Sequence, residues 1–188
     1  MEIIFGIGGN NMDKIIYFEN NNPNTSICSG SLYFEFLDYA FNCADYFMLV
    51  YVNYYGKGYS SIMKEFSKKL QKFKVKSRSN PSWPGTQSTY SHKTTYKIVF
   101  YRTDLEAKEI LKTVSSLNMW SSPTYPQDLA FFKKEECWFY SVGHENIAAI
   151  LRPTDEDYCF VEKKGLAHRR NAKPLGEYYD SYNEIISS

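Results

Sequence analysis

The chain of 188 residues lacks the features that mark several large protein classes. Its formal net charge is +1, so no overall field draws it to nucleic acid or to an anionic membrane. The most apolar stretch, residues 32–52, contains Glu35, Asp38 and Asp45, a charge density that excludes a bilayer span. No basic segment followed by an apolar one opens the chain, as it would in a secretion signal. We therefore expect a soluble, cytoplasmic protein.

Cysteine and histidine are too few and too scattered to indicate a metal centre. The four cysteines form no CxxC pair and have no histidine at ligand spacing: Cys28, Cys43, Cys137 and Cys159. The three histidines likewise have no neighbouring ligands of the kind that mark a zinc site: His92, His144 and His168. We expect no metal and no cofactor, and cysteines that are buried free thiols rather than disulfides.

Aromatic residues are the abundant class, at 18% of the chain. A chain of this size buries about 70% of its surface on folding, which suffices for a core without crosslinks. The aromatic content exceeds what that core needs, so we expect some aromatic side chains to be exposed or half exposed and to mark a binding surface. Trp83 and Trp120, each near prolines, either frame a groove or cover the core, and Trp138 is the third candidate binding residue.

Hydrophobic periodicity predicts one α+β domain over residues 31–164, between an N-terminal lead (1–30) and a polar C-terminal tail (165–188). Helices are predicted over residues 31–44, 61–70, 103–117 and 154–164. Strands are predicted over residues 14–18, 46–54, 73–79, 94–101, 129–132, 137–142 and 147–151. A capping box is expected to begin the helix at Thr103, Thr154 with Asp157 is expected to cap the last helix, and Pro84-Gly85 is expected at the centre of a type II turn.

The middle of the chain runs strand, helix, strand, strand, helix, strand, which is the split β-α-β order of ferredoxin-like folds. This order predicts a mainly antiparallel sheet with helices on one face, residues 46–54 and 94–101 inside it, and residues 73–79 at an edge. The apolar sequence of the first two segments suits interior strands. The alternate Lys and Arg residues of the third suit an edge strand. An N-terminal helix and a C-terminal hairpin are expected as additions to this core.

One histidine lies beside carboxylates and is the weak candidate for chemistry. His144 is followed by Glu145, with Asp128 upstream, and a carboxylate that orients a histidine allows general acid–base catalysis. No nucleophile motif or second histidine at metal spacing accompanies them. Adjacent residues in a strand also point to opposite faces. A structural turn histidine is therefore the favoured interpretation, and a small enzyme is the alternative.

A basic tract from Lys64 to Arg78 contains seven cations and one acid. Lys74, Lys76 and Arg78 alternate along its predicted strand and are candidate binding residues. Such a face beside aromatic residues could bind RNA on a sheet. Residues 96–101 lack the glycine of an RNA-recognition strand, so a solvated helix face and a protected edge are the favoured interpretation.

Several segments together resemble a family of small soluble bacterial proteins, mainly from Firmicutes, some labelled stage III sporulation protein. The matching residues are Trp83-Pro84-Gly85-Thr86, Ser122-Pro123, Pro126-Gln127-Asp128-Leu129, Trp138-Phe139 and Ser141-Val142-Gly143-His144-Glu145. The blocks are also similar to those of immunity proteins of bacterial toxin systems, which act by binding. The resemblance covers about residues 31–160. It implies no catalytic residues, but it implies that Trp83, Asp128, Trp138, His144 and Glu145 form one constellation.

These observations favour a protein-binding module, either of the immunity type or a regulatory partner of another protein. They rest on the aromatic content, the near-zero net charge and the missing catalytic motif. An enzyme using His144 with Glu145 or Asp128 is the first alternative, and a nucleic-acid binder through the face from Lys64 to Arg78 is the second. No membrane partner is expected.

Overall fold

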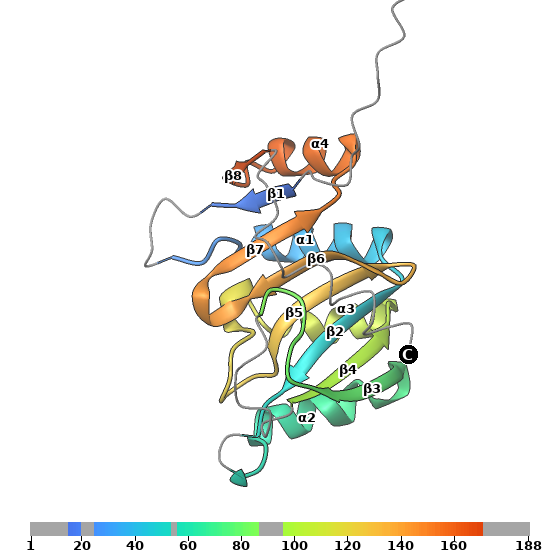
Figure 1. Ribbon diagram of the computed structural model, residues 1–188. Helices are drawn as coiled ribbons and strands as arrows, with labels where there is room; N and C mark the ends of the chain where they lie inside the picture. The colour runs from blue at the N-terminus through green and yellow to red at the C-terminus, as the bar shows by residue number, and fades with distance from the viewer. Residues whose placement is uncertain (1–14, 20–24, 54–55, 87–95, 171–188) are drawn as a thin grey trace, which may run out of the picture.

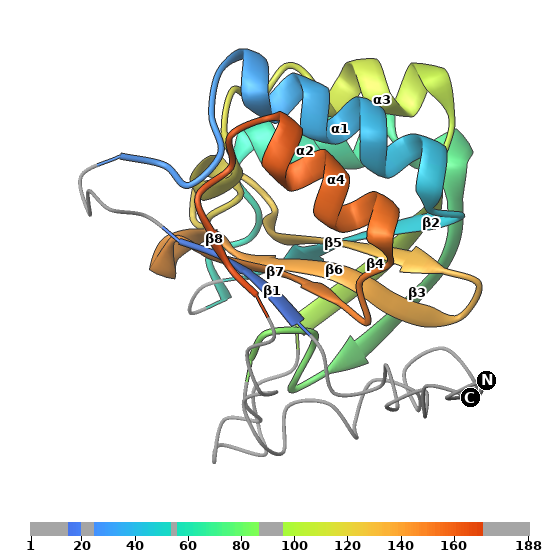
Figure 2. The same cartoon turned by 90° about the horizontal axis from the view of Figure 1, so that it is seen from above.

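The computed structural model describes residues 15–19, 25–53, 56–86 and 96–170. One antiparallel sheet of eight strands has the order β3-β4-β2-β5-β6-β7-β1-β8. The strands are β1 (Ile15–Phe18), β2 (Tyr46–Tyr51), β3 (Lys74–Asn80), β4 (Tyr96–Arg102), β5 (Gln127–Lys133), β6 (Glu136–Val142), β7 (Ile147–Leu151) and β8 (His168–Arg169). The helices are α1 (Ser31–Cys43), α2 (Ser61–Lys69), α3 (Leu105–Leu111) and α4 (Asp155–Lys163), with short 3₁₀ helices η3 (Gln71–Phe73), η4 (Leu117–Met119) and η5 (Gly143–Glu145). All four α-helices lie on one face of the sheet (Figures 1 and 2).

The central part of the sheet follows the predicted split β-α-β order. Strand β4 lies between β3 and β2, and β2 lies between β4 and β5, with every neighbouring pair antiparallel. Helix α2 connects β2 to β3, and α3 connects β4 to β5. The α+β class is therefore confirmed, with β2 and β4 inside the sheet and β3 at its edge. Strand β2 is interior because its alternate residues are apolar on both faces.

The sheet extends beyond the residues expected for the domain. Ile15–Phe18 of the expected lead is buried and pairs with β7, and His168–Arg169 of the expected tail pairs with β1. Four consecutive apolar residues cannot stay solvated at low cost, which explains the burial of β1. Strand β5 also serves twice, because it is both the fourth strand of the central order and the first strand of the hairpin with β6.

The start of α3 differs from its prediction. Its N-cap is Asp104, whose side chain accepts a hydrogen bond from the Glu106 amide, whereas the Thr103 hydroxyl donates to the Ala44 carbonyl at 2.7 Å. The prediction of a capping box at Thr103 was wrong because that hydroxyl holds β4 to the start of β2. The helix ends at Leu111 rather than near residue 117. The cap of Thr154 with Asp157 is confirmed and takes the form of a capping box.

The core consists of two apolar layers, one on each face of the sheet. The layer under the helices is rich in rings such as Phe36, Phe47, Phe131 and Phe139. Within the described ranges every Phe, Tyr and Trp is buried or half-buried. Half-buried rings such as Tyr39, Tyr59 and Tyr125 fit the prediction, and no aromatic side chain in this part of the chain is fully exposed, because the sheet has two faces to cover and the aromatic residues fill both layers.

Candidate functional site

The turn that follows β3 is held in place by one tryptophan. The Trp83 carbonyl accepts a hydrogen bond from the Thr86 amide at 3.0 Å, and Gly85 has a φ of +86°, which is the predicted type II turn. A Cβ at Gly85 would lie 2.6 Å from the Tyr140 ring, so the turn packs directly on β6. Trp83 itself is 5% exposed and packs in the layer opposite the helices.

Asp128 lies at a bulge in β5 and accepts a hydrogen bond from this turn. Its φ is +58°, a conformation that aspartate tolerates, and the register of β5 with β2 shifts there. The Trp83 indole N–H and the Gln127 amide donate to Asp128 Oδ2 at 2.7 and 3.1 Å, and the Gly143 amide donates to Oδ1 at 3.0 Å. Burial raises the pKa of the carboxyl to about 6, although these donors oppose the rise. We call Asp128, Trp83, Gln127 and Gly143 the Asp128 node.

The candidate acid–base pair stands beside this node but outside it. His144 and Glu145 belong to η5, their side chains are more than half exposed, and His144 Nε2 lies 3.6 Å from Glu145 Oε1. Asp128 is fully buried, and each of its oxygens already accepts a hydrogen bond. The structure therefore brings Trp83, Asp128 and the turn of His144 together, but it leaves the buried carboxylate no open side from which to act on a substrate.

The other two tryptophans are parts of the core. Trp120 is fully buried, and its indole N–H donates to the Tyr33 hydroxyl at 2.9 Å. Trp138 is 3% exposed and lies on the helix side of the sheet, with the Lys133 ammonium 4.1 Å from its ring centroid. Of the two interpretations open for Trp83 and Trp120, the structure fits the one in which they cover the core, and Trp138 lies in the other layer from Trp83 and does not join the constellation around Asp128.

The basic tract does not form a single face. On α2 and η3, Lys69 pairs with Glu65 at 2.6 Å and Lys72 pairs with Glu106. On β3, Lys74, Lys76 and Arg78 are half-buried and alternate with exposed Ser77 and Ser79. The tract therefore splits between two surfaces.

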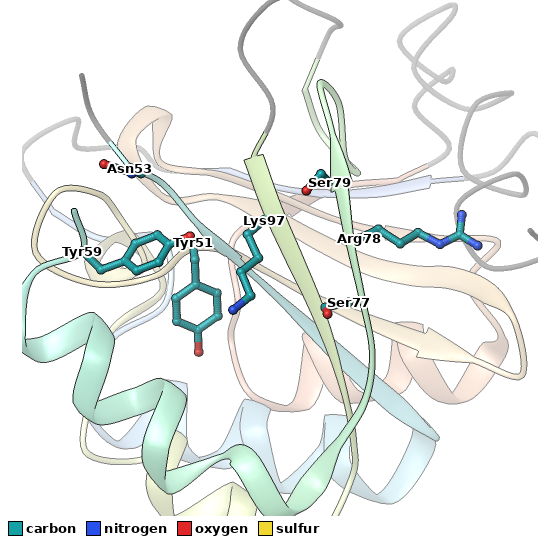
Figure 3. Close-up of a pocket in the computed structure, with 7 residues that line it drawn as sticks. All are labelled: Tyr51, Asn53, Tyr59, Ser77, Arg78, Ser79 and Lys97. Atoms are coloured by element: carbon teal, nitrogen blue, oxygen red, sulfur yellow. The ribbon is translucent and has the colours of Figure 1, made fainter. Parts of the chain in front are cut away.

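A hollow opens between α2 and the end of the sheet where β2 finishes and β4 begins (Figure 3). It has two lobes of about 390 and about 400 Å³, which share Tyr51, Tyr59 and Lys97. The polar lobe is further lined by Asn53, Ser77, Arg78 and Ser79. The other lobe, which we call the α2 lobe, is further lined by Met63, Lys64, Ser67, Lys68 and Gln71. We call the whole the α2–β4 hollow.

The strand register decides which side chains face this hollow. Ser79 pairs with Lys97 and Ser77 with Val99, so these residues share the sheet face that the helices cover. Arg78 pairs with Ile98 of the opposite layer, and its side chain points away from Lys97 in Figure 3. Lys97 extends alongside the Tyr51 ring, in the direction of α2.

The charge of the hollow has one sign. Among the described residues its lining includes Lys64, Lys68 and Lys97 and no carboxylate. Within the described ranges these three lysines form no ion pair, whereas Lys69, on another face of α2, does. Lys97 was missed by the sequence analysis, although a lysine inside the apolar run of residues 96–101 was a signal that could have found it. A positive hollow without internal counter-charges can bind an anionic group.

The described residues give little support for a metal site or a reactive thiol. They include no group of three His, Cys, Asp or Glu side chains placed to hold a metal ion. All four cysteines are free; Cys28 and Cys137 are buried, Cys43 is half-buried and Cys159 is exposed. Burial raises the pKa of the Cys28 thiol to about 12, which leaves it without thiolate at neutral pH. Among the described helices, none has the length and apolar character needed to cross a bilayer.

Comparison with known proteins gives no further guide to the site. A scan against protein-family models, a search of curated proteins and a search of solved structures each find no match. The resemblance to the Firmicutes family therefore stays a prediction.

Proposed function

We propose that the protein is a protein-binding module, of the immunity type or a regulatory partner, and that it binds through the α2–β4 hollow. The observation that carries the proposal is the set of lysines around one hollow that have no carboxylate partner among the described residues. Among the described lysines on other surfaces, Lys108 and Lys112 pair with Asp38 whereas Lys134 and Lys163 form no ion pair, so what distinguishes this site is that its unpaired lysines surround one hollow. Charges left unpaired around a hollow are available to a second molecule.

A binding role fits the structure better than catalysis by the candidate trio. Asp128 is buried and accepts hydrogen bonds from three donors that hold the fold together. His144 and Glu145 are exposed on a turn, and neither lines a lobe of the hollow. A general base needs access to the proton it removes, which this carboxylate does not have.

A protein fits the hollow better than a nucleic acid does. Single-stranded nucleic acids bind to grooves where bases stack on open aromatic faces. Tyr51, at the centre of the hollow, is only 2% exposed, and its hydroxyl is 2.8 Å from that of Tyr101. The cations that would track a phosphate backbone are divided between two surfaces, and Lys69 and Lys72 are paired with carboxylates. Carboxylates of a partner protein can pair with the lysines and require no exposed aromatic ring.

The test uses a photoreactive phenylalanine analogue in the full chain, expressed in its native cells. At Gln71, an exposed residue on the rim of the hollow, we expect irradiation to yield an adduct with one discrete protein. The matched control is Leu105, which is 74% exposed on α3 and should give no such adduct. Lys97→Glu should abolish the adduct from Gln71. No adduct, an adduct with RNA, or equal adducts from both positions would overturn the proposal.

A further inference from the structure

The two lobes of the α2–β4 hollow differ in chemistry, and Lys97 lies at their boundary. We infer that the hollow binds an extended acidic segment of the partner that carries one large apolar side chain. This inference rests on the proposed function and goes further, because it names what the partner must present: an apolar side chain for the α2 lobe, with carboxylates close to it on both sides.

The α2 lobe has an apolar, rigid floor. Met63 and Tyr51 are 1% and 2% exposed, so they are fixed by the core beneath them. The Tyr59 ring meets the Tyr51 ring edge to face at 6.1 Å, and the hydroxyl contact with Tyr101 fixes the other end of Tyr51. A volume of about 400 Å³ is at the lower end of ligand sites, which suits one side chain rather than a helix. Because so little of Tyr51 and Met63 is exposed, an apolar side chain placed here would pack mainly on the half-buried Tyr59 ring and the methylene stems of Lys64 and Lys68, over a floor that does not have to rearrange.

Cations stand on two sides of that floor. Lys64 and Lys68 are four residues apart on α2, so they lie on the same face of the helix. Lys97 reaches the hollow from β4 on the other side (Figure 3). A segment lying across the lobe would therefore meet a lysine before and after its apolar side chain. Carboxylates at these places would pair with the lysines that have no acidic partner among the described residues.

The polar lobe continues the same path along β3. Ser77 and Ser79 are exposed, and both lie on the face that carries Lys97. Their hydroxyl groups can donate to and accept from the backbone of an extended segment. On the far rim, the Asn53 side chain accepts a hydrogen bond from the Gly58 amide at 2.7 Å, which holds this part of the rim in place.

Short peptides test the inference directly with the full chain. The probe is a fluorescent peptide of sequence Asp-Glu-Phe-Glu-Asp, with a second peptide in which Ala replaces Phe, and binding is followed by fluorescence polarisation. We expect the Ala peptide to bind about tenfold more weakly, because it loses most of the apolar contact. In the protein, Lys97→Ala should weaken binding of the Phe peptide about fivefold, as expected for one partly exposed charge pair.

The control variant is Lys69→Ala, which removes a lysine of the same helix whose charge is already paired, and it should leave the affinity unchanged. Equal affinity for the two peptides, equal losses in the two variants, or tighter binding of a five-residue uridine oligonucleotide would overturn the inference. If the peptides do not bind but the cross-link from Gln71 still finds a protein, this inference falls and the proposed function stands. If the cross-link also fails, both fall.

Discussion

The Asp128 node and the α2–β4 hollow both collect polar side chains from separate parts of the chain, yet they are opposite in kind. In the node the carboxylate is fully buried and each oxygen has at least one donor. In the hollow Lys64 and Lys68 are exposed and have no carboxylate partner among the described residues. A buried polar group whose bonds are complete stabilises the fold, whereas unpaired charges around a hollow stay available to another molecule. We therefore interpret the Asp128 node as a structural centre and the α2–β4 hollow as the proposed binding surface.

The largest effect should come from removing the centre of the node. Asp128→Ala leaves the Trp83 indole, the Gln127 amide and the Gly143 amide without their acceptor inside the protein. It also places alanine at a φ of +58°. We expect the free energy of unfolding to fall by about 4 kcal/mol, measured by urea denaturation. Glu145→Ala, on the exposed turn nearby, is the control and should change it by less than about 0.5 kcal/mol. Similar losses in both variants would contradict a structural role for Asp128 that the exposed Glu145 does not share.

The pH dependence of stability sharpens the same point. The pKa of Asp128 rises from 3.8 to about 6 on folding, so the folded state holds its proton at pH values where the unfolded state has lost it. This contribution to stability is complete below pH 3.8 and is lost as the pH rises toward 6. At about 1.4 kcal/mol for each pH unit of pKa difference, it amounts to about 3 kcal/mol.

The measurement compares the wild-type protein with Asp128→Asn in urea titrations at several pH values between 4 and 7. Asparagine tolerates the same backbone conformation and does not titrate. The wild-type stability should therefore decrease relative to that of the variant as the pH rises from 4 to 6, and the difference should be constant above about pH 7. A difference that is flat throughout would show that this carboxyl does not titrate in that range.

Much of the fold could be predicted because local patterns and burial agree in the centre of the sheet. The apolar run of β2 and the alternating cations of β3 indicate an interior and an edge strand without knowledge of the partners. Strand β8 could not be found, because two residues carry no periodicity. The cap of α3 was misplaced because Thr103 and Asp104 are both capping residues, and only the position of the Ala44 carbonyl decides between them.

The site was harder to predict because it depends on contacts between distant segments. The Asp128 carboxylate looked available for chemistry, and only the loop of Trp83, 45 residues earlier, shows that its oxygens are used. The hollow joins α2 to the start of β4, so Lys97 becomes a neighbour of Lys64 and Lys68 only when the sheet is formed. The spacing of these residues along the chain predicts neither arrangement.

Removing the hydrogen-bonded indole of the node should destabilise the protein less than removing Asp128, and more than removing an indole that makes no hydrogen bond. Trp83→Phe keeps an aromatic ring in the loop but removes the N–H that donates to Asp128, so we expect a loss of about 1–2 kcal/mol in the free energy of unfolding. Trp138→Phe is the matched control, because its buried indole nitrogen has no hydrogen-bond partner in the described structure. That change should cost less, since no hydrogen bond is broken. A greater loss from Trp138→Phe in the same urea titrations would contradict the role given to the node.

The smallest effect should come from the hollow. Lys97→Ala removes a half-buried charge that lies near other lysines and has no carboxylate partner in the described residues, so the fold loses no ion pair and some repulsion is relieved. We expect the free energy of unfolding to stay within about 0.5 kcal/mol of the wild-type value, measured by the same titration. Lys69→Ala, which does break an ion pair at the surface, should be no more stable than Lys97→Ala. If Lys97→Ala proved as destabilising as Trp83→Phe, Lys97 would be needed for the stability of the fold. The proposed binding role of this lysine, at the boundary of the two lobes, would then lose its support.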